Sequence, residues 1–124
     1  MKNSIFQDQK DFMEACGQST DGSDISQYMM YLDLITEEYN ELSSAVAAKD
    51  DVEQLDALID ILVVTVGAIV SRGWDAQAAW DEVMSTNFAK VDPETGKVRK
   101  REDGKILKPD GWKYPNLKRF VEEN

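Results

Sequence analysis

The sequence contains no histidine and only one cysteine, Cys16. Zinc sites in proteins use mainly histidine and cysteine ligands, and a di-iron four-helix bundle needs Glu-x-x-His on two helices, so the composition argues against both kinds of metal centre. One cysteine cannot form an internal disulfide. We expect Cys16 to be a small buried side chain.

Basic residues are scarce in the first part of the chain. Residues 1–89 carry 4 basic and 17 acidic side chains, whereas residues 90–124 carry 10 basic and 7 acidic ones, and the net charge is −10. An acidic surface repels nucleic acid phosphates and anionic lipids. We therefore expect no nucleic acid and no membrane partner, and we expect the acidic part to attract divalent cations.

The sequence also lacks a long apolar run. The longest, at residues 61–70, is shorter than the roughly 20 residues that span a bilayer, and residues 1–15 lack the apolar stretch of a signal peptide. We expect a soluble, cytoplasmic protein. A chain of 124 residues that is 42% hydrophobic fits one domain with a modest core.

Apolar residues recur at helical spacing in four segments and predict an all-α fold, a four-helix bundle. Ser4 and Asp50 are suitable N-caps for the first and third helices. The short connection before Asp50 predicts that the second and third helices are antiparallel neighbours. The predicted helices cover residues 4–17, 26–48, 51–72 and 76–89.

Glycine and proline become frequent after residue 90. The Asp103-Gly104 pair lies between the segments Lys97–Arg101 and Lys105–Lys108 and predicts a small basic β-hairpin, followed by an extended tail. The sequence thus predicts a single domain over residues 1–124, with a helical body at about 4–90 and a basic hairpin and tail at about 91–124.

The third predicted helix is apolar around most of its circumference, from Leu55 to Val70. Three short neighbouring helices cannot cover such a surface. We therefore expect a homodimer or a homotetramer that buries the remaining face.

Two neighbouring predicted helices carry paired acidic residues. Glu38 and Glu41 are three residues apart in the second helix, and Asp56 and Asp60 are four apart in the third, so each pair shares a helix face. Antiparallel packing can bring the two pairs together. The alternative is that Glu37, Glu38 and Glu41 form an ordinary solvated helix face, and the composition is equally compatible with both interpretations.

Asp60 is the most informative of these residues because it lies between Ile59 and Ile61. An unpaired buried carboxylate costs several kcal/mol, so it must be protonated, paired with a cation or bound to a metal. Four carboxylates without histidine or cysteine suit a hard ion such as Mg²⁺, with Mn²⁺ also possible. Magnesium with open coordination positions typically binds phosphates.

Four segments together resemble the MazG-like all-α nucleoside triphosphate pyrophosphohydrolases. They are Glu37-Glu38-x-x-Glu41, the acidic pair that ends at Asp60, NFAK at 87–90 and GKILKPDGW at 104–112. The resemblance implies a helical homo-oligomer that uses Mg²⁺ to hydrolyse (deoxy)nucleoside triphosphates to monophosphate and pyrophosphate, as in house-cleaning of the nucleotide pool.

The same resemblance implies roles for single residues of the acidic part. Glu38 and Glu41 match the first pair of metal ligands, and Asp60 matches the aspartate of the second motif. Asp56 would complete the metal site. Glu37 matches an acidic position that orients or deprotonates the attacking water, so Glu37 and Glu38 are the candidate catalytic residues.

Residues of the basic part are candidates for substrate binding. Asn87 and Lys90 match an Asn-x-x-Lys that contacts substrate in relatives. Lys105 and Lys108 can steady the departing pyrophosphate, and Trp112 is an aromatic candidate for contact with the base. The lysines fit equally well a role in complementing the acidic part of a neighbouring subunit.

The sequence departs from the family pattern at two positions. Ala57 stands where relatives have a glutamate three residues before Asp60, and either Asp56 or Glu53 can replace it. Tyr31 stands where many relatives have an arginine, so the resemblance does not indicate which nucleotide is the substrate. A phosphoribosyl-ATP pyrophosphohydrolase, a nucleotide-binding module without turnover and a purely structural oligomer remain alternatives.

Overall fold

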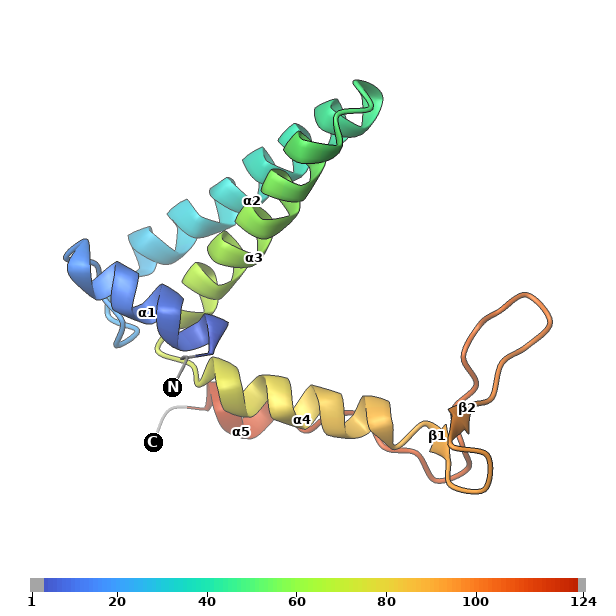
Figure 1. The fold of residues 1–124 in the computed structure, drawn as a ribbon. Coiled ribbons are helices and arrows are strands. Elements are labelled where there is room, and N and C mark those ends of the chain that lie inside the picture. The colour runs from blue at the N-terminus through green and yellow to red at the C-terminus, as the bar shows by residue number, and fades with distance from the viewer. Residues whose placement is uncertain (1–3, 123–124) are drawn as a thin grey trace. The chain divides into compact units, whose positions relative to one another are not determined.

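Two long antiparallel helices, α2 (Ile25–Ala47) and α3 (Asp51–Ser71), form the largest feature of the fold. The computed structural model describes residues 4–122, and Figure 1 shows the two helices side by side along their length. The side chain of Asp50 accepts a hydrogen bond of 3.1 Å from the backbone N–H of Glu53 and so caps α3. The predicted pairing and the predicted cap are confirmed.

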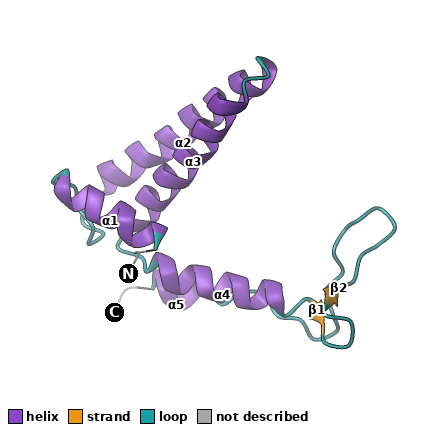
Figure 2. Cartoon of the chain, in the orientation of Figure 1, coloured by secondary structure: helices purple, strands orange, loops and turns teal. Residues whose placement is uncertain are grey.

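The other helices are shorter (Figure 2). α1 (Ile5–Ala15) is capped by Ser4, whose hydroxyl accepts from the backbone N–H of Gln7 at 3.1 Å, and α4 comprises Ala76–Phe88. The ends of all four predicted helices are correct within two residues, and the all-α class is confirmed. A fifth helix, α5 (Lys118–Val121), lies in the segment predicted as an extended tail.

The chain forms two compact units. The first extends to Ala76 and contains α1, α2 and α3, whereas the second begins at Gln77 and contains most of α4, two hairpins and α5. In the first unit α1 packs against α3. The largest buried core side chains of this unit are Met13 and Tyr31, with Val64, Val66, Ala68 and Val70 around them.

Tyr31 packs unusually close to α3. Its ring lies where a Cβ on Gly67 would be only 2.3 Å from a ring carbon, so a glycine is required at this point of the helix. The hydroxyl of Tyr31 donates a hydrogen bond of 2.6 Å to Gln18 Oε1. Tyr31, which replaces the arginine expected from relatives, is therefore a core residue that fixes the distance between α2 and α3.

A buried polar network joins the loop before α2 to the end of α3. Gln27 Nε2 donates to the carbonyl oxygen of Ser19 at 2.7 Å and to Ser71 Oγ at 2.8 Å, while Ser19 N–H donates to Gln27 Oε1 at 2.9 Å. Ser71 is fully buried, and its hydroxyl donates to the carbonyl oxygen of Gly67. Satisfied polar groups of this kind stabilise one packing arrangement over others.

One face of α3 remains uncovered. Leu55 is 63% exposed, and Leu58, Ile59 and Leu62 are each about half exposed. The predicted surplus of apolar surface is therefore present. α3 is also the one helix among residues 4–122 whose length and hydropathy, 1.8 over its best window, would allow a membrane span, a test that core helices of soluble proteins also pass. The expectation that no membrane partner is involved therefore stays a prediction.

One expectation about burial is wrong. Cys16 is exposed, because it is the C-cap residue of α1 and lies beyond Met13, the last core residue of that helix. On α4, Trp80 is 51% exposed, although it is at helical spacing from half-buried Val83 and Met84. Helical spacing identified the stripe on α4 but not how much of that stripe the chain covers.

A two-stranded hairpin follows α4, formed by β1 (Val91–Asp92) and β2 (Lys97–Val98). The strands are antiparallel with Val91 opposite Val98, and Gly96 closes the turn by donating to the carbonyl oxygen of Asp92 at 2.8 Å. The sequence analysis did not predict this turn.

The hairpin predicted around Asp103-Gly104 is present directly after β2. Lys100 and Ile106 form an isolated antiparallel bridge, and Arg101 N–H donates to the carbonyl oxygen of Lys105 at 2.8 Å. Asp103 Oδ1 accepts from Lys105 N–H at 3.0 Å. The turn chemistry was predicted correctly, although the pairing is shorter than two full strands.

The contact between Gly67 and Tyr31 allows a test of the packing of α2 on α3. Gly67→Ala should lower the free energy of unfolding by about 1–3 kcal/mol, because the new methyl group collides with the ring. Urea denaturation measures this change. In the double variant Gly67→Ala/Tyr31→Leu the clash is removed, so its loss of stability should be smaller than the sum of the two single losses. Additive losses would contradict the close contact.

Candidate active site

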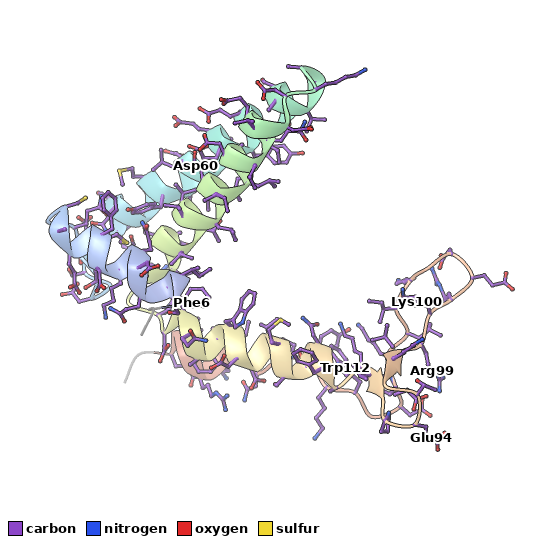
Figure 3. All side chains as sticks on the ribbon, in the orientation of Figure 1. Phe6, Asp60, Glu94, Arg99, Lys100 and Trp112 are labelled. Atoms are coloured by element: carbon purple, nitrogen blue, oxygen red, sulfur yellow. The ribbon has the colours of Figure 1, made fainter. Side chains whose placement is uncertain are left out.

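The acidic residues predicted as metal ligands lie on the α2–α3 pair. Glu38 and Glu41 are on α2 and Asp56 and Asp60 on α3, where Figure 3 labels Asp60. The charges of Glu41, Asp60 and Asp56 all act on the carboxyl group of Glu38. The antiparallel pairing therefore brings the four carboxyl groups into one acidic cluster.

Glu38 has the most perturbed carboxyl group of this acidic cluster. Burial, followed by a hydrogen bond with Glu41 and by the charges of Glu41, Asp60 and Asp56, raises the pKa of Glu38 from 4.5 to about 7. Two carboxyl groups share a hydrogen bond only when one of them is protonated. Near neutral pH, Glu38 in the metal-free cluster therefore exchanges between its protonated and its deprotonated form.

The pKa of Asp60 is also raised. Burial raises the pKa of its carboxyl group, with further contributions from the charges of Asp56 and Glu41 and from a hydrogen bond with Asp56. Asp60 is partly buried, as its position between two isoleucines suggests. The cluster thus consists of two carboxyl pairs, each on one helix, that repel each other across the contact between α2 and α3.

No cation of the protein compensates this repulsion within the described chain. None of the ion pairs among residues 4–122 involves the four carboxylates, and Glu38 Oε2 is buried without a hydrogen-bond partner there. As the side chains stand, no three acidic, histidine or cysteine groups in this range are close enough to hold a metal ion. The donor set of oxygens alone, with its orphaned buried oxygen, nevertheless suits a hard divalent cation.

Asp56 and Glu53 differ in their effect on the other carboxyl groups of the acidic cluster. Asp56 contributes to the raised pKa of both Glu38 and Asp60, and Glu53 contributes to neither. Ala57, in the position where relatives have a glutamate, is only 3% exposed. Asp56, one position before Ala57 on α3, carries the carboxylate that acts on Glu38 and Asp60.

Glu37 lies outside the acidic cluster. It is exposed on α2, and among the described residues it is not one of the charges that act on Glu38 or Asp60. Its role with the attacking water stays a prediction.

An open cavity of about 530 Å³ borders the acidic cluster. Glu41 and Asp56 line it, as does Glu53, together with the polar residues Asn40 and Ser44. The sequence analysis did not single out Asn40 or Ser44. Asn40 and Ser44 lie three and seven residues after Glu37, so they share a helix face with it. This spacing is the signal in the sequence that could have identified them.

Four of the five substrate-binding candidates gather in the second unit. Lys90 Nζ donates to Asn87 Oδ1 at 3.1 Å and lies 5.1 Å from the centre of the Trp112 ring. Lys108 Nζ lies 4.7 Å from the same ring and 4.6 Å from that of Tyr114. We call Asn87, Lys90, Lys108 and Trp112 the basic cluster. Tyr114, which the sequence analysis missed, contacts it.

Lys105 is not part of the basic cluster in the described chain. Its backbone pairs with Arg101 and Asp103 in the second hairpin, and its side chain is exposed. Trp112 also differs from expectation in its surroundings. Two ammonium groups lie near its ring, so the ring contacts cations in this structure, and cation–π attraction offsets part of the repulsion between them.

Comparison with known families identifies the class of protein. The sequence model of the phosphoribosyl-ATP pyrophosphohydrolase family matches residues 9–87, which include α2, α3 and most of α4. The chain therefore belongs to the phosphoribosyl-ATP pyrophosphohydrolase family, within the MazG-like all-α nucleotide pyrophosphohydrolases. No curated protein matches the sequence.

The pKa of Glu38 leads to a test by pH. Its folded-state pKa, about 7, is above the ordinary 4.5, so without metal the protein should lose stability as the pH rises from about 4.5 through 7. A cation needs deprotonated ligands, so 10 mM Mg²⁺ should raise the melting temperature at pH 8 by roughly 3 °C or more and have little effect at pH 5.5.

Differential scanning fluorimetry measures both effects. Glu38→Gln should flatten the metal-free dependence between pH 5 and 7 and remove most of the stabilisation by Mg²⁺. Glu53→Gln, a charge-matched control outside the acidic cluster, should keep both. Equal Mg²⁺ stabilisation at the two pH values in the unmodified protein would contradict the proposed ligands.

Proposed function

We propose that this protein is a Mg²⁺-dependent pyrophosphohydrolase of (deoxy)nucleoside triphosphates that resembles the MazG enzymes and acts in house-cleaning of the nucleotide pool. The observation that carries the proposal is the acidic cluster of α2 and α3, whose crowded carboxylates have no cation of the protein beside them among residues 4–122. Hydrolysis of a nucleotide pyrophosphate bond is the activity of the family. The triphosphate substrate and the cytoplasmic location are our proposals.

The reaction adds water to the α-phosphorus and breaks the bond between that phosphorus and the oxygen bridging to the β-phosphate. Nucleoside monophosphate and pyrophosphate result. Glu38, Glu41, Asp56 and Asp60 would hold the Mg²⁺, which supplies a bound water of lowered pKa and offsets phosphate charge. Glu37 would accept the proton of the attacking water.

The basic cluster would contact the phosphates. Lys90 and Lys108 present two ammonium groups beside Trp112, and Asn87 orients Lys90 through its hydrogen bond. Cations placed where negative charge increases on the leaving group stabilise the transition state. Lys105 would assist from the neighbouring hairpin.

Phosphoribosyl-ATP is the second candidate substrate, favoured by the family match. It carries the same triphosphate chain, so the same acidic residues and the same metal would serve. The lysines from residue 90 onward lie beyond the matched range 9–87. The contribution of these lysines to substrate binding therefore has to be tested with nucleoside triphosphates and with phosphoribosyl-ATP.

The proposal predicts which carboxylates are essential. With Mg²⁺, release of pyrophosphate should be detectable from at least one member of a panel of ribo- and deoxynucleoside triphosphates and phosphoribosyl-ATP. Asp60→Asn and Asp56→Ala should lower kcat/KM on the order of 100-fold or more, because several kcal/mol of charge stabilisation depend on the metal ligands.

Glu53→Gln is the control and should stay within a few-fold of the unmodified protein. Loss of activity in Glu53→Gln with retention in Asp56→Ala would reverse the assignment of the fourth ligand. Binding of nucleotides without turnover would identify a regulatory module, and neither binding nor turnover would favour a structural role.

We also propose that the uncovered face of α3 is buried in a homodimer or homotetramer. Leu58, Ile59 and Leu62 are each about half exposed, and a cavity of about 230 Å³ between α1 and α3 is lined largely by apolar side chains such as Ile5 and Val63. Burying apolar area stabilises by about 25 cal/mol per Å². A second copy of the chain supplies an equally apolar surface by symmetry.

Sedimentation equilibrium tests this assembly. The unmodified chain of 14.0 kDa should sediment as a dimer or tetramer, and Leu62→Lys should shift it toward the monomer, because a charge on this face opposes burial. Ser43→Lys, an exposed site on α2, should leave the mass unchanged. An unmodified protein that sediments as a monomer at 50 µM would contradict the proposed assembly.

A further inference from the structure

The segment after the second hairpin runs back along α4 within the second unit. Trp112 Nε1 donates a hydrogen bond of 2.7 Å to the carbonyl oxygen of Thr86. Farther along, Asn116 N–H donates to Glu82 Oε2 at 2.8 Å, and Arg119 Nη2 donates to Glu82 Oε1 at 3.1 Å. Figure 1 shows α5 beside α4. We call residues 112–119 the strap.

The attachment points lie on one side of α4. Glu82 and Thr86 are four residues apart and so share a face, and Lys90 follows four residues later, just past the helix end at Phe88. The strap contacts these positions in reverse order. It therefore aligns Trp112 with the end of α4, the place where Lys90 and Asn87 lie.

Glu82 uses both carboxylate oxygens to hold the strap. Its side chain is 20% exposed, while that of Arg119 is 58% exposed, so the pair is partly shielded from water. Hydrogen bonds that involve charged groups are stronger than neutral ones. Glu82 is the α4 side chain that forms an ion pair with the strap, and it also accepts a backbone N–H from it.

Lys108, four residues before the strap begins at Trp112, adds a second cation to the basic cluster. Lys108 Nζ lies 4.7 Å from the centre of the Trp112 ring and hydrogen-bonds with the hydroxyl group of Tyr114 at 3.3 Å. Lys90 Nζ lies 5.1 Å from the same ring. Because two ammonium groups beside one ring repel each other, the strap needs an attachment elsewhere to keep them together.

We propose that Glu82 is a positioning residue that holds the strap on α4 and thereby keeps Trp112 and Lys108 beside Lys90, ready for an oligophosphate anion. Glu82 acts through the strap and does not itself touch the substrate. The inference rests on the proposed function in one respect, that the basic cluster contacts the phosphates of the substrate.

Two measurements test the proposal on the full chain. In a Trp74→Phe/Trp80→Phe background, acrylamide quenching of fluorescence reports the accessibility of Trp112 alone. Affinity is measured with Mg²⁺ and α,β-imido deoxynucleoside triphosphates, which cannot be cleaved between the α- and β-phosphates. Circular dichroism verifies that each variant retains its helices.

Glu82→Ala should increase the quenching constant clearly and weaken binding about tenfold, the effect of losing a charge-assisted hydrogen bond. Glu82→Gln keeps an oxygen for Asn116 N–H and should have a smaller effect on both. Asp81→Asn removes a neighbouring charge on α4 and should stay within about twofold of the background protein, since long-range charge effects at an exposed site are screened.

Unchanged quenching in Glu82→Ala would overturn the proposal, whatever the activity. So would increased quenching with unchanged affinity, or unchanged affinity in Lys108→Ala. Failure of the proposed function looks different. In that case the unmodified protein releases no pyrophosphate from any substrate, while weaker binding by Glu82→Ala still supports the positioning role.

Discussion

The close packing of α2 against α3 is the constraint on which the rest of the structure depends. Apolar burial drives the two helices together, and Gly67 lets the ring of Tyr31 approach the α3 backbone. The same packing forces Glu38 toward Asp56 and Asp60, which is unfavourable without a cation. The core thus stabilises a repulsive arrangement of carboxylates, as is common where burial shifts the pKa of functional groups.

The two compact units carry clusters of opposite charge. The acidic cluster lies on long helices, whose backbone hydrogen bonds fix the spacing of the carboxylates. The basic cluster depends instead on a non-helical segment held by a few long-range contacts, such as those of Trp112 and Glu82. The family match ends at residue 87, so this second cluster belongs largely to the part of the chain beyond it.

Features that depend on nearby residues could be predicted from the sequence. The caps Ser4 and Asp50 and the turn at Asp103 each use a hydrogen bond between residues two or three apart, and all are present. Apart from the pairing of α2 with α3, features that depend on distant contacts were missed. α5 contacts Glu82 across 37 residues, and the exposure of Cys16 depends on what packs around it.

The sequence by itself determined the helical segments, the acid pairs on single helix faces and the excess of apolar surface on α3, because periodicity and capping act within a few residues. Only the tertiary structure decided that Asp56 rather than Glu53 joins the acidic cluster, and that Lys108 and Trp112 reach Lys90 while Lys105 does not. Those outcomes depend on distances between segments that the chain brings together only when it folds, and no local pattern encodes such distances.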